Sequence, residues 1–194
     1  MNLKVKDIFY SLQGEGGRQG EASIFIRLSG CNLNCDFCDT DFEGGEKLSL
    51  GQILLIIRQF PCRWIVWTGG EPTLQLTDKC LQFFKIAGYL QAIESNGHNR
   101  LSKLLDYTVV SPKGSADYAA EINPKVSEIR LPVRANDSIP PIESLPEAAF
   151  YFLSPVFTEN PEETKANIAY CVEQVKLHPE WRLSLQVHKW IGIE

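Results

Sequence analysis

Short apolar segments alternate with helical segments along most of this chain, and this alternation constrains the fold more than any other feature. Seven segments have the β-branched and aromatic character of strands: 23–30, 63–68, 89–94, 106–110, 128–133, 150–153 and 182–187. Strands separated by helices or long crossovers form mostly parallel sheets. A full eight-unit barrel takes about 250 residues, and this chain has 194. The expected fold is therefore α/β, an incomplete TIM-like barrel with about six parallel strands.

Local signals predict three helices between these strands. One begins after Ser49, where Gln52 completes a capping box. A second covers 73–87. The third is the longest: it has Asn160 as its N-cap and runs to about Leu177. The strand and helix order contains no repeat and no long linker, so a single domain over 1–194 is expected.

Composition excludes several classes of protein. Hydrophobic residues are 44% and charged residues 22% of the chain, which is ordinary for a globular protein. No apolar run approaches the roughly 20 residues that a membrane span needs. The first ten residues lack the apolar core of a secretory signal, so a cytoplasmic location is expected. A net charge of −5 argues against a nucleic-acid partner.

Polar, often glycine-bearing clusters follow five of the predicted strands, after Gly30, Thr68, Glu94, Val110 and Leu153. Turns favour such residues, which explains any one cluster. All five clusters follow the carboxyl end of a predicted strand. The carboxyl ends of parallel strands lie together at one rim of the sheet, and ligands bind at that rim. The sequence therefore predicts a binding site at this rim.

Three of the six cysteines, Cys31, Cys35 and Cys38, have C-x3-C-x2-C spacing directly after the first predicted parallel strand. Thiolates are soft ligands that suit zinc or iron–sulfur centres. A closed zinc site needs four ligands, and the nearest further candidates are hard aspartates. The spacing therefore favours a [4Fe–4S] cluster with one iron that lacks a protein ligand.

A zinc site closed by a distant residue, such as Cys62 or His98, is the alternative to a cluster. Without a ligand role, Cys62, Cys80 and Cys171 are expected to be buried small apolar residues.

The cysteine spacing, with Phe37 before the third cysteine, resembles the radical S-adenosylmethionine (radical SAM) superfamily. The sequence Gly-Gly-Glu-Pro at 69–72 resembles a motif of the same superfamily. The resemblance implies a radical SAM core in which the open iron chelates S-adenosylmethionine. It further implies that the reduced cluster cleaves this cofactor to a 5′-deoxyadenosyl radical.

Within that superfamily the chain resembles the 7-carboxy-7-deazaguanine synthase family over nearly its whole length. The resemblance is carried by 8–16 (IFYSLQGEG), Arg27, 38–40 (CDT), 94–97 (ESNG), 111–113 (SPK) and 185–189 (LQVHK). It implies conversion of 6-carboxy-5,6,7,8-tetrahydropterin to 7-carboxy-7-deazaguanine with release of ammonia, in queuosine biosynthesis. A glycyl-radical enzyme activase and a non-catalytic zinc-binding module are the alternatives.

The resemblance also assigns residues to the two ligands. A pterin offers a guanidine-like edge, which Gln13 and Glu15 can read, and a carboxylate, which Arg27 can clamp. The full expected substrate set is Leu12, Gln13, Gly14, Glu15, Arg27, Thr68 and Glu194. The expected S-adenosylmethionine set is Phe37, Cys38, Asp39, Gly70, Glu94, Ser111, Pro112, Lys113, Ser154, Pro155, Val156 and Phe157.

Four further expectations concern single residues and partners. Thr40 is expected to ligate Mg²⁺, which prefers hard oxygens. Two roles are open for His188, a catalytic proton-transfer group or a packed histidine. Relatives often have Gln-Pro-Met-Asp where this chain has 154–157 (SPVF), so an adenosyl contact there is expected through the backbone or in altered form. The family also implies a homodimer and a flavodoxin-type reductant.

Overall fold

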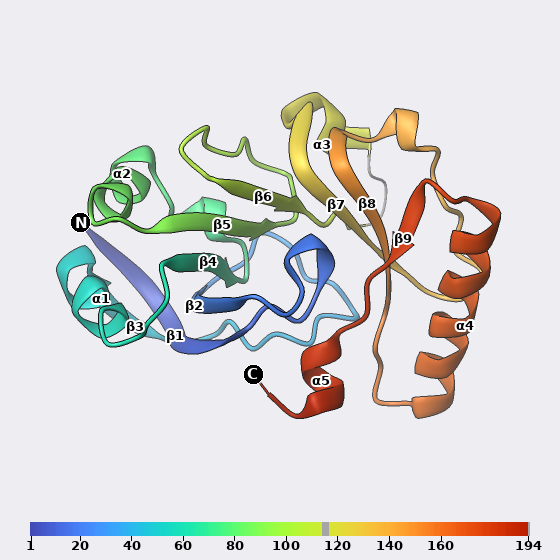
Figure 1. The fold of residues 1–194 in the computed structure, drawn as a ribbon, viewed down its shortest axis with the longest axis horizontal. Coiled ribbons are helices and arrows are strands. Elements are labelled where there is room, and N and C mark those ends of the chain that lie inside the picture. Colours follow the sequence, from blue (N-terminus) through green and yellow to red (C-terminus); the bar gives the residue numbers. More distant parts are fainter. Residues whose placement is uncertain (114–116, 194) are drawn as a thin grey trace.

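The computed structural model describes residues 1–113 and 117–193, and one open sheet runs through it (Figure 1). Within those residues nine strands lie in the order β3-β1-β2-β4-β5-β6-β7-β8-β9. Their bounds are β1 Asn2–Leu12, β2 Ala22–Leu28, β3 Glu46–Ser49, β4 Trp64–Gly69, β5 Leu90–Ser95, β6 Tyr107–Val110, β7 Lys125–Val133, β8 Glu147–Pro155 and β9 Trp181–Leu183.

Seven neighbouring strands of the sheet, β2 and β4 to β9, pair in parallel. Strands β1 and β3 lie beyond β2 and pair antiparallel. The expected partial barrel is thus confirmed, with seven parallel strands in the described residues where about six were expected.

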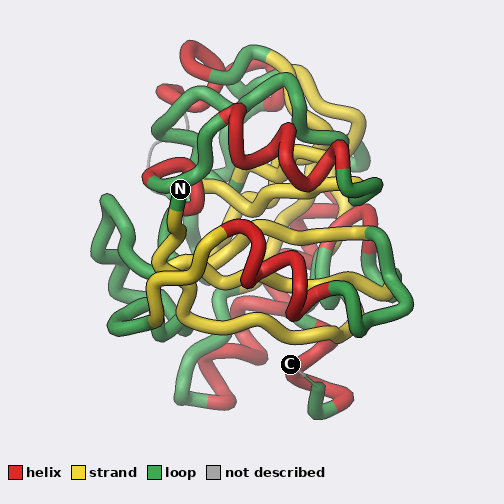
Figure 2. The backbone as a smooth tube through the Cα atoms, turned by 90° about the vertical axis from the view of Figure 1, so that its left-hand side faces the viewer, coloured by secondary structure: helices red, strands yellow, loops and turns green. Residues whose placement is uncertain are grey.

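The helices lie mainly outside the sheet (Figure 2). Their bounds are α1 Leu50–Ile57, α2 Asp78–Ile86, α3 Asp117–Ile122, α4 Pro161–Leu177 and α5 Val187–Ile191, with 3-10 turns η1 Gly16–Arg18, η2 Pro72–Leu74 and η3 Ile142–Ser144. In the described part of the chain, no helix combines the length and apolar character that a membrane span requires.

The predicted caps of α1 and α4 are confirmed. Ser49 and Gln52 form both hydrogen bonds of a capping box at the start of α1. Asn160 accepts hydrogen bonds from the backbone N–H groups of Glu162 and Glu163 at the start of α4. Each cap satisfies N–H groups that have no partner inside the helix, which explains why these two helices begin where the sequence predicted.

Two expectations about element bounds are wrong. The helix expected over 73–87 begins only at Asp78, because the Glu71 side chain holds Thr73 in the 3-10 turn η2 and Thr77 caps α2 separately. The strand expected over 182–187 ends at Leu183, and α5 starts at Val187.

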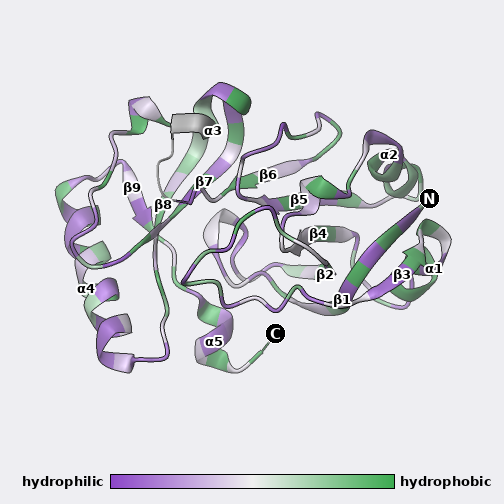
Figure 3. Ribbon diagram, turned by 180° about the vertical axis from the view of Figure 1, so that it is seen from behind, coloured by the Kyte–Doolittle hydropathy of each residue, from purple (hydrophilic) through white to green (hydrophobic). Residues whose placement is uncertain are grey.

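The N-terminal segment forms β1, which no strand prediction covered. It pairs antiparallel with β2 on one side and with β3 on the other. Hydrophilic and hydrophobic residues alternate along its first half (Figure 3), with Leu3 and Val5 buried between exposed neighbours. This alternation is typical of a strand with one buried face. Strand β1 leads to the loop after Leu12, which lies at the carboxyl ends of the parallel strands.

Apolar side chains pack between the sheet and the helices in two clusters. One includes Ile65, Trp67, Phe84 and Cys80, and the other includes Ile129, Leu153, Trp181 and Cys171. The exposed fractions of Cys62, Cys80 and Cys171 are 9%, 0% and 0%, so their expected burial is confirmed.

Candidate active site

A cleft of about 460 Å³ opens at the carboxyl ends of the parallel strands, at the rim that the sequence predicted. Most of the predicted site residues line it: Leu12, Gln13, Gly14, Glu15, Arg27, Cys31, Cys35, Phe37, Cys38, Asp39, Thr40, Thr68, Gly70, Glu94, Ser111, Lys113, Ser154, Pro155, Val156, Phe157 and His188. Pro112 is buried and does not line the cleft. Glu194 lies outside the described residues.

The cysteine loop contributes three free thiols to this cleft. Cys31 and Cys35 are partly exposed and Cys38 is exposed. Burial raises the pKa of Cys35, and the neighbouring Cys38 and Cys31 raise it further. The backbone N–H of Leu33 donates a hydrogen bond to Cys31 Sγ at 3.4 Å, a contact that stabilises a thiolate.

Among residues 1–113 and 117–193, no three His, Cys, Asp or Glu side chains converge on a single ion. A cubane cluster does not require such convergence, because each cysteine binds a different iron. Three soft thiols on one loop therefore fit a [4Fe–4S] cluster better than a closed zinc site.

The distant zinc ligands considered above do not fit. The Cys62 thiol donates to the carbonyl oxygen of Ala22 at 3.1 Å, which places it at the amino ends of β2 and β4. Cys31 follows the opposite, carboxyl end of β2. His98 does not line the cleft.

The glycine turn after β4 packs against the backbone that leads to the cysteines. Gly69 has φ +127°, and a side chain there would collide with the backbone of Leu28. A side chain at Gly70 would collide with the backbone of Gly30, and the Gly70 N–H donates to the Leu28 carbonyl at 3.1 Å. These glycines therefore allow β4 to approach β2, while Gly70 also lines the cleft.

Glu71, the acidic residue of the Gly-Gly-Glu-Pro motif, is fully buried and connects three loops of the site. Its carboxylate accepts hydrogen bonds from the Thr73 N–H (3.0 Å), the Thr73 hydroxyl (2.6 Å), the Ser95 hydroxyl (3.0 Å) and the Asn96 N–H (2.8 Å). The Asn96 side chain in turn donates to Asn32 in the cysteine loop at 2.8 Å. Glu71 thereby fixes the ends of β4 and β5 relative to the cysteines.

Cations flank the aromatic residue of the cysteine loop. The Lys113 ammonium and the Arg134 guanidinium each lie 5.5 Å from the centre of the Phe37 ring. Lys113 also donates to the Ser111 hydroxyl at 2.8 Å, and burial lowers its pKa. Lys113 is thus held inside the cleft rather than solvated on the surface.

Helix α5 is tied to the cysteine loop at Asp39. Lys189 forms an ion pair with this carboxylate, and the Gln186 amide donates to it at 3.4 Å. Burial alone would raise the pKa of Asp39, but the hydrogen bond and charge of Lys189 outweigh burial and lower it. The C-terminal segment and the segment after the third cysteine therefore form one wall of the cleft.

The predicted substrate-binding segment contacts this C-terminal wall. A side chain at Gly14 would collide with the His188 ring, and the Val187 N–H donates to the Gly14 carbonyl at 3.1 Å. The space that Gly14 leaves is thus filled by His188, not by a ligand. Burial lowers the pKa of His188, against the opposing charges of Glu15 and Asp39.

Arg27 lines the cleft with its guanidinium 5.5 Å from the centre of the Phe9 ring. Among the described residues no carboxylate forms an ion pair with it. An ordinary surface ion pair therefore does not explain this arginine, which interrupts the apolar strand β2.

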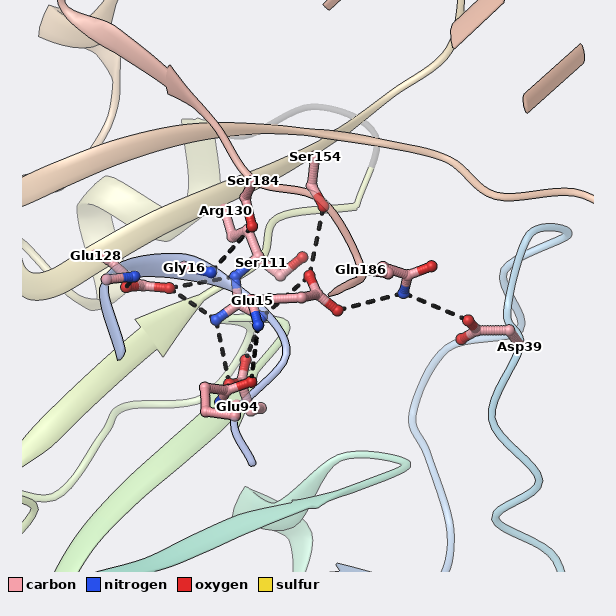
Figure 4. Close-up of polar contacts among 12 residues, drawn as sticks. Glu15, Gly16, Asp39, Glu94, Ser111, Glu128, Arg130, Ser154, Ser184 and Gln186 are labelled. Carbon is pink, nitrogen blue, oxygen red and sulfur yellow. Dashed lines mark hydrogen bonds and ion pairs between the residues drawn. The ribbon is translucent and has the colours of Figure 1, made fainter. Parts of the chain in front are cut away.

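Arg130 is the main residue of the site that the sequence did not predict. It is 7% exposed and lies among three carboxylates: Glu128 at 2.7 Å, Glu94 at 3.1 Å and Glu15 at 3.3 Å (Figure 4). Burial raises the pKa of Glu94, while the three carboxylates raise that of Arg130 against the effect of its burial. Two charged residues, Glu128 and Arg130, on one face of an apolar strand were the available signal.

The segment after β8 contacts Glu15 through a side chain. Ser154 is buried, and its hydroxyl lies 3.4 Å from Glu15 Oε2 (Figure 4). The other oxygen of Glu15 accepts from the Gln186 amide at 3.2 Å. Phe157 meets Trp190 edge to face. The short serine is therefore used inside the cleft wall, where Pro155, Val156 and Phe157 also lie.

Comparison with known proteins assigns the chain to a family. The model of the radical SAM superfamily matches residues 25–174. A 7-carboxy-7-deazaguanine synthase from Bacteroides thetaiotaomicron is 38% identical over 193 residues, covering both chains completely. An enzyme of the same name from Haemophilus influenzae is 37% identical, covering all of this chain and 95% of the relative.

A solved structure has the same fold. The crystal structure of QueE from Escherichia coli matches with a TM-score of 0.71 and 24% identity, covering 97% of this chain and 95% of that one.

Proposed function

This chain belongs to the 7-carboxy-7-deazaguanine synthase family of the radical SAM superfamily, and from that membership we propose its reaction. It converts 6-carboxy-5,6,7,8-tetrahydropterin to 7-carboxy-7-deazaguanine and releases ammonia, in queuosine biosynthesis. Its cofactors are a [4Fe–4S] cluster and S-adenosylmethionine, with Mg²⁺ as an assisting ion.

The observation that carries this proposal is that one cleft holds both halves of the required chemistry. The thiols of the cysteine loop and the side chains of Gln13, Glu15 and Arg27 line the same cavity of about 460 Å³. That volume is within the usual range for a small-molecule site. A glycyl-radical enzyme activase acts on a protein and has no need of this polar set.

On the cofactor side, Cys31, Cys35 and Cys38 each hold one iron. When bound and reduced, the cluster supplies the electron that cleaves S-adenosylmethionine. Residues from five strand ends surround this part of the cleft and bind the cofactor: Phe37, Asp39, Gly70, Glu94, Ser111, Lys113 and the backbone of 154–157. Pro112, behind the lining, contributes by shaping the turn before Lys113.

On the substrate side, the charges of the cleft match the two ends of the pterin. The Arg27 guanidinium, which forms no ion pair within 4.0 Å among the described residues, binds the substrate carboxylate in a bidentate manner. Gln13 and Glu15 accept hydrogen bonds from the guanidine-like edge, with Leu12, Gly14 and Thr68 completing the wall. Glu194 is proposed at this site from the resemblance alone.

Two further roles complete the reaction. His188, which lines the cleft, transfers a proton during the reaction. The Thr40 hydroxyl would ligate Mg²⁺, an ion that prefers hard oxygen ligands. Thr40 lines the cleft, as this role requires.

The remaining parts of the proposal rest on the resemblance. They are a flavodoxin-type reductant, a homodimer, a cytoplasmic location and a single radical SAM domain over 1–194. Light scattering behind a size-exclusion column tests the homodimer directly.

An anaerobic assay of the reconstituted protein tests the reaction. The reconstituted protein should be brown and absorb broadly at about 400 nm. With the carboxypterin, S-adenosylmethionine and reductant, it should form 7-carboxy-7-deazaguanine. Cys38→Ala should lose both colour and product, while the matched control Cys62→Ser should keep both. A colourless protein that binds one zinc would contradict the proposal.

A further inference from the structure

Each of the three guanidinium nitrogens of Arg130 lies within 3.3 Å of a carboxylate oxygen. Nε and Nη2 donate to Glu128 Oε1 at 3.2 and 2.7 Å. Nη2 also donates to Glu94 Oε1 at 3.2 Å, while Nη1 lies 3.1 Å from Glu94 Oε2 and 3.3 Å from Glu15 Oε2. An arginine fork offers five N–H donors in a fixed plane, so its orientation fixes the positions of all three carboxylates.

Glu128 orients this fork from outside the cleft. It is 1% exposed and does not line the cavity. Its second oxygen accepts hydrogen bonds from the Tyr107 hydroxyl at 2.7 Å and from the Gly17 N–H at 2.8 Å. A side chain at Gly16 or Gly17 would collide with this carboxylate or with Tyr107. Glu128 therefore has one available orientation, and Arg130 takes its own from it.

The two carboxylates at the other end of the fork belong to different parts of the cleft. Glu15 lies in the loop after β1, 115 residues from Arg130, and Glu94 lies on β5, 36 residues away. Gln13, beside Glu15 in sequence, also donates to Glu94 at 2.9 Å. Under the proposed function, Glu15 binds the pterin and Glu94 faces S-adenosylmethionine.

We propose that Arg130 is a positioning residue that sets the separation of Glu15 and Glu94, and with it the alignment of the pterin and S-adenosylmethionine. This role rests on the proposed function. Arg130 brings together two carboxylates that would otherwise repel each other, and its plane determines where both point. A lysine keeps one positive charge but offers a single point of attachment, so it cannot hold the two carboxylates in the same relative orientation.

The test compares Arg130→Lys with wild type in the anaerobically reconstituted enzyme. Misplacing reacting groups by about 1 Å costs on the order of 100-fold in rate, so kcat/KM for the carboxypterin should fall about 10- to 100-fold. The ratio of 5′-deoxyadenosine released to product formed should rise several-fold, because cofactor cleavage continues while the ligands are misaligned. Titration calorimetry should show weaker pterin binding. The iron content of the variant, measured separately, should equal that of wild type.

Arg182→Lys is the matched control. Arg182 is exposed on β9, where its guanidinium lies 4.5 Å from the centre of the Phe150 ring, and it does not line the cleft. It should keep the wild-type rate, ratio and affinity.

Glu128→Gln provides a second route if Arg130→Lys does not fold. The amide oxygen of the glutamine still accepts from Tyr107 and Gly17, but its NH₂ group faces Arg130. Because Glu128 does not line the cleft, a fall of about tenfold or more in kcat/KM with a raised 5′-deoxyadenosine ratio must act through Arg130.

Three outcomes are distinguishable. Loss of turnover together with the raised ratio supports the positioning role. Folded variants with the wild-type ratio and affinity overturn it, as does a rate that falls only in proportion to iron content. Wild-type protein that neither binds nor converts the carboxypterin contradicts the proposed function instead.

Discussion

Replacing Glu71 by glutamine should destabilise the protein although the two side chains have nearly the same shape. Both carboxylate oxygens accept hydrogen bonds: Oε1 from the Thr73 N–H, the Thr73 hydroxyl and the Ser95 hydroxyl, and Oε2 from the Asn96 N–H. A glutamine has one oxygen and one NH₂ group, so either orientation sets an N–H donor against another donor inside a fully buried site.

The size of the effect follows from those contacts. A hydrogen bond to a charged group contributes about 1.5–3 kcal/mol, and a buried donor left without a partner costs about 1–3 kcal/mol. Removing the charge relieves part of its desolvation, so we expect a net loss of about 3 kcal/mol in the free energy of unfolding. In a domain of this size each kcal/mol lowers the thermal midpoint by about 2–4 °C, which predicts a fall of about 6–12 °C.

The assay compares thermal midpoints at one scan rate and equal iron content, because cluster loss makes unfolding irreversible. Glu147→Gln is the matched control. Its ion pair with Lys125 has side chains 71% and 74% exposed, and such a pair contributes about 0–1 kcal/mol. A midpoint for Glu71→Gln within 2 °C of that control, on the order of 1 kcal/mol, would refute the reasoning.

Three further predictions concern binding, metal dependence and thiol chemistry. Arg27→Ala should weaken carboxypterin binding by one to several decades, since truncating a charge-assisted pair costs about 2–5 kcal/mol; unchanged affinity in titration calorimetry, with intact S-adenosylmethionine binding, would remove Arg27 from the site. Thr40→Ala should lose most of the stimulation of turnover by Mg²⁺, while Thr40→Ser should recover part of it. An alanine variant whose turnover responds to Mg²⁺ as wild type does would show that Thr40 is not the ligand. Burial raises the pKa of both Cys80 and Cys171 to about 12, so at pH 8 these thiols stay protonated and should resist iodoacetamide in folded, cluster-free protein. Rapid alkylation of either thiol at pH 8, detected by mass spectrometry, would contradict their burial.

The sequence predicts the parallel half of the fold well because the signals there are local. Each buried strand is an apolar run, and the caps at Ser49 and Asn160 are side chains that bond to their own helix. The first half of β1 carries an alternating pattern, but its burial depends on pairing with β2 and β3, which short-range patterns do not specify. The 3-10 turn at 72–74 was missed because Glu71 is held by Ser95 and Asn96, two dozen residues away.

In the candidate site too, residues in contiguous motifs could be predicted from the sequence, whereas a residue that depends on long-range contacts could not. The cysteine loop, the glycine turn and Gln13–Glu15 are contiguous motifs, so a resemblance finds them, and the structure brings them to one cleft. Arg130 belongs to no motif. Its importance comes from Glu15, Glu94 and Glu128, which meet only when β1, β5 and β7 are assembled. Pairing across such sequence distances is a property of the folded chain.

The conversion of the carboxypterin by purified, reconstituted protein tests the central claim most directly. Under anaerobic conditions with S-adenosylmethionine, Mg²⁺ and a reductant, the account predicts that 6-carboxy-5,6,7,8-tetrahydropterin is consumed while 7-carboxy-7-deazaguanine and ammonia appear in equal amounts. It also predicts that Cys31→Ala, Cys35→Ala and Cys38→Ala each abolish both products. A protein that holds a full [4Fe–4S] cluster and cleaves S-adenosylmethionine, yet leaves the carboxypterin unchanged, would contradict the account.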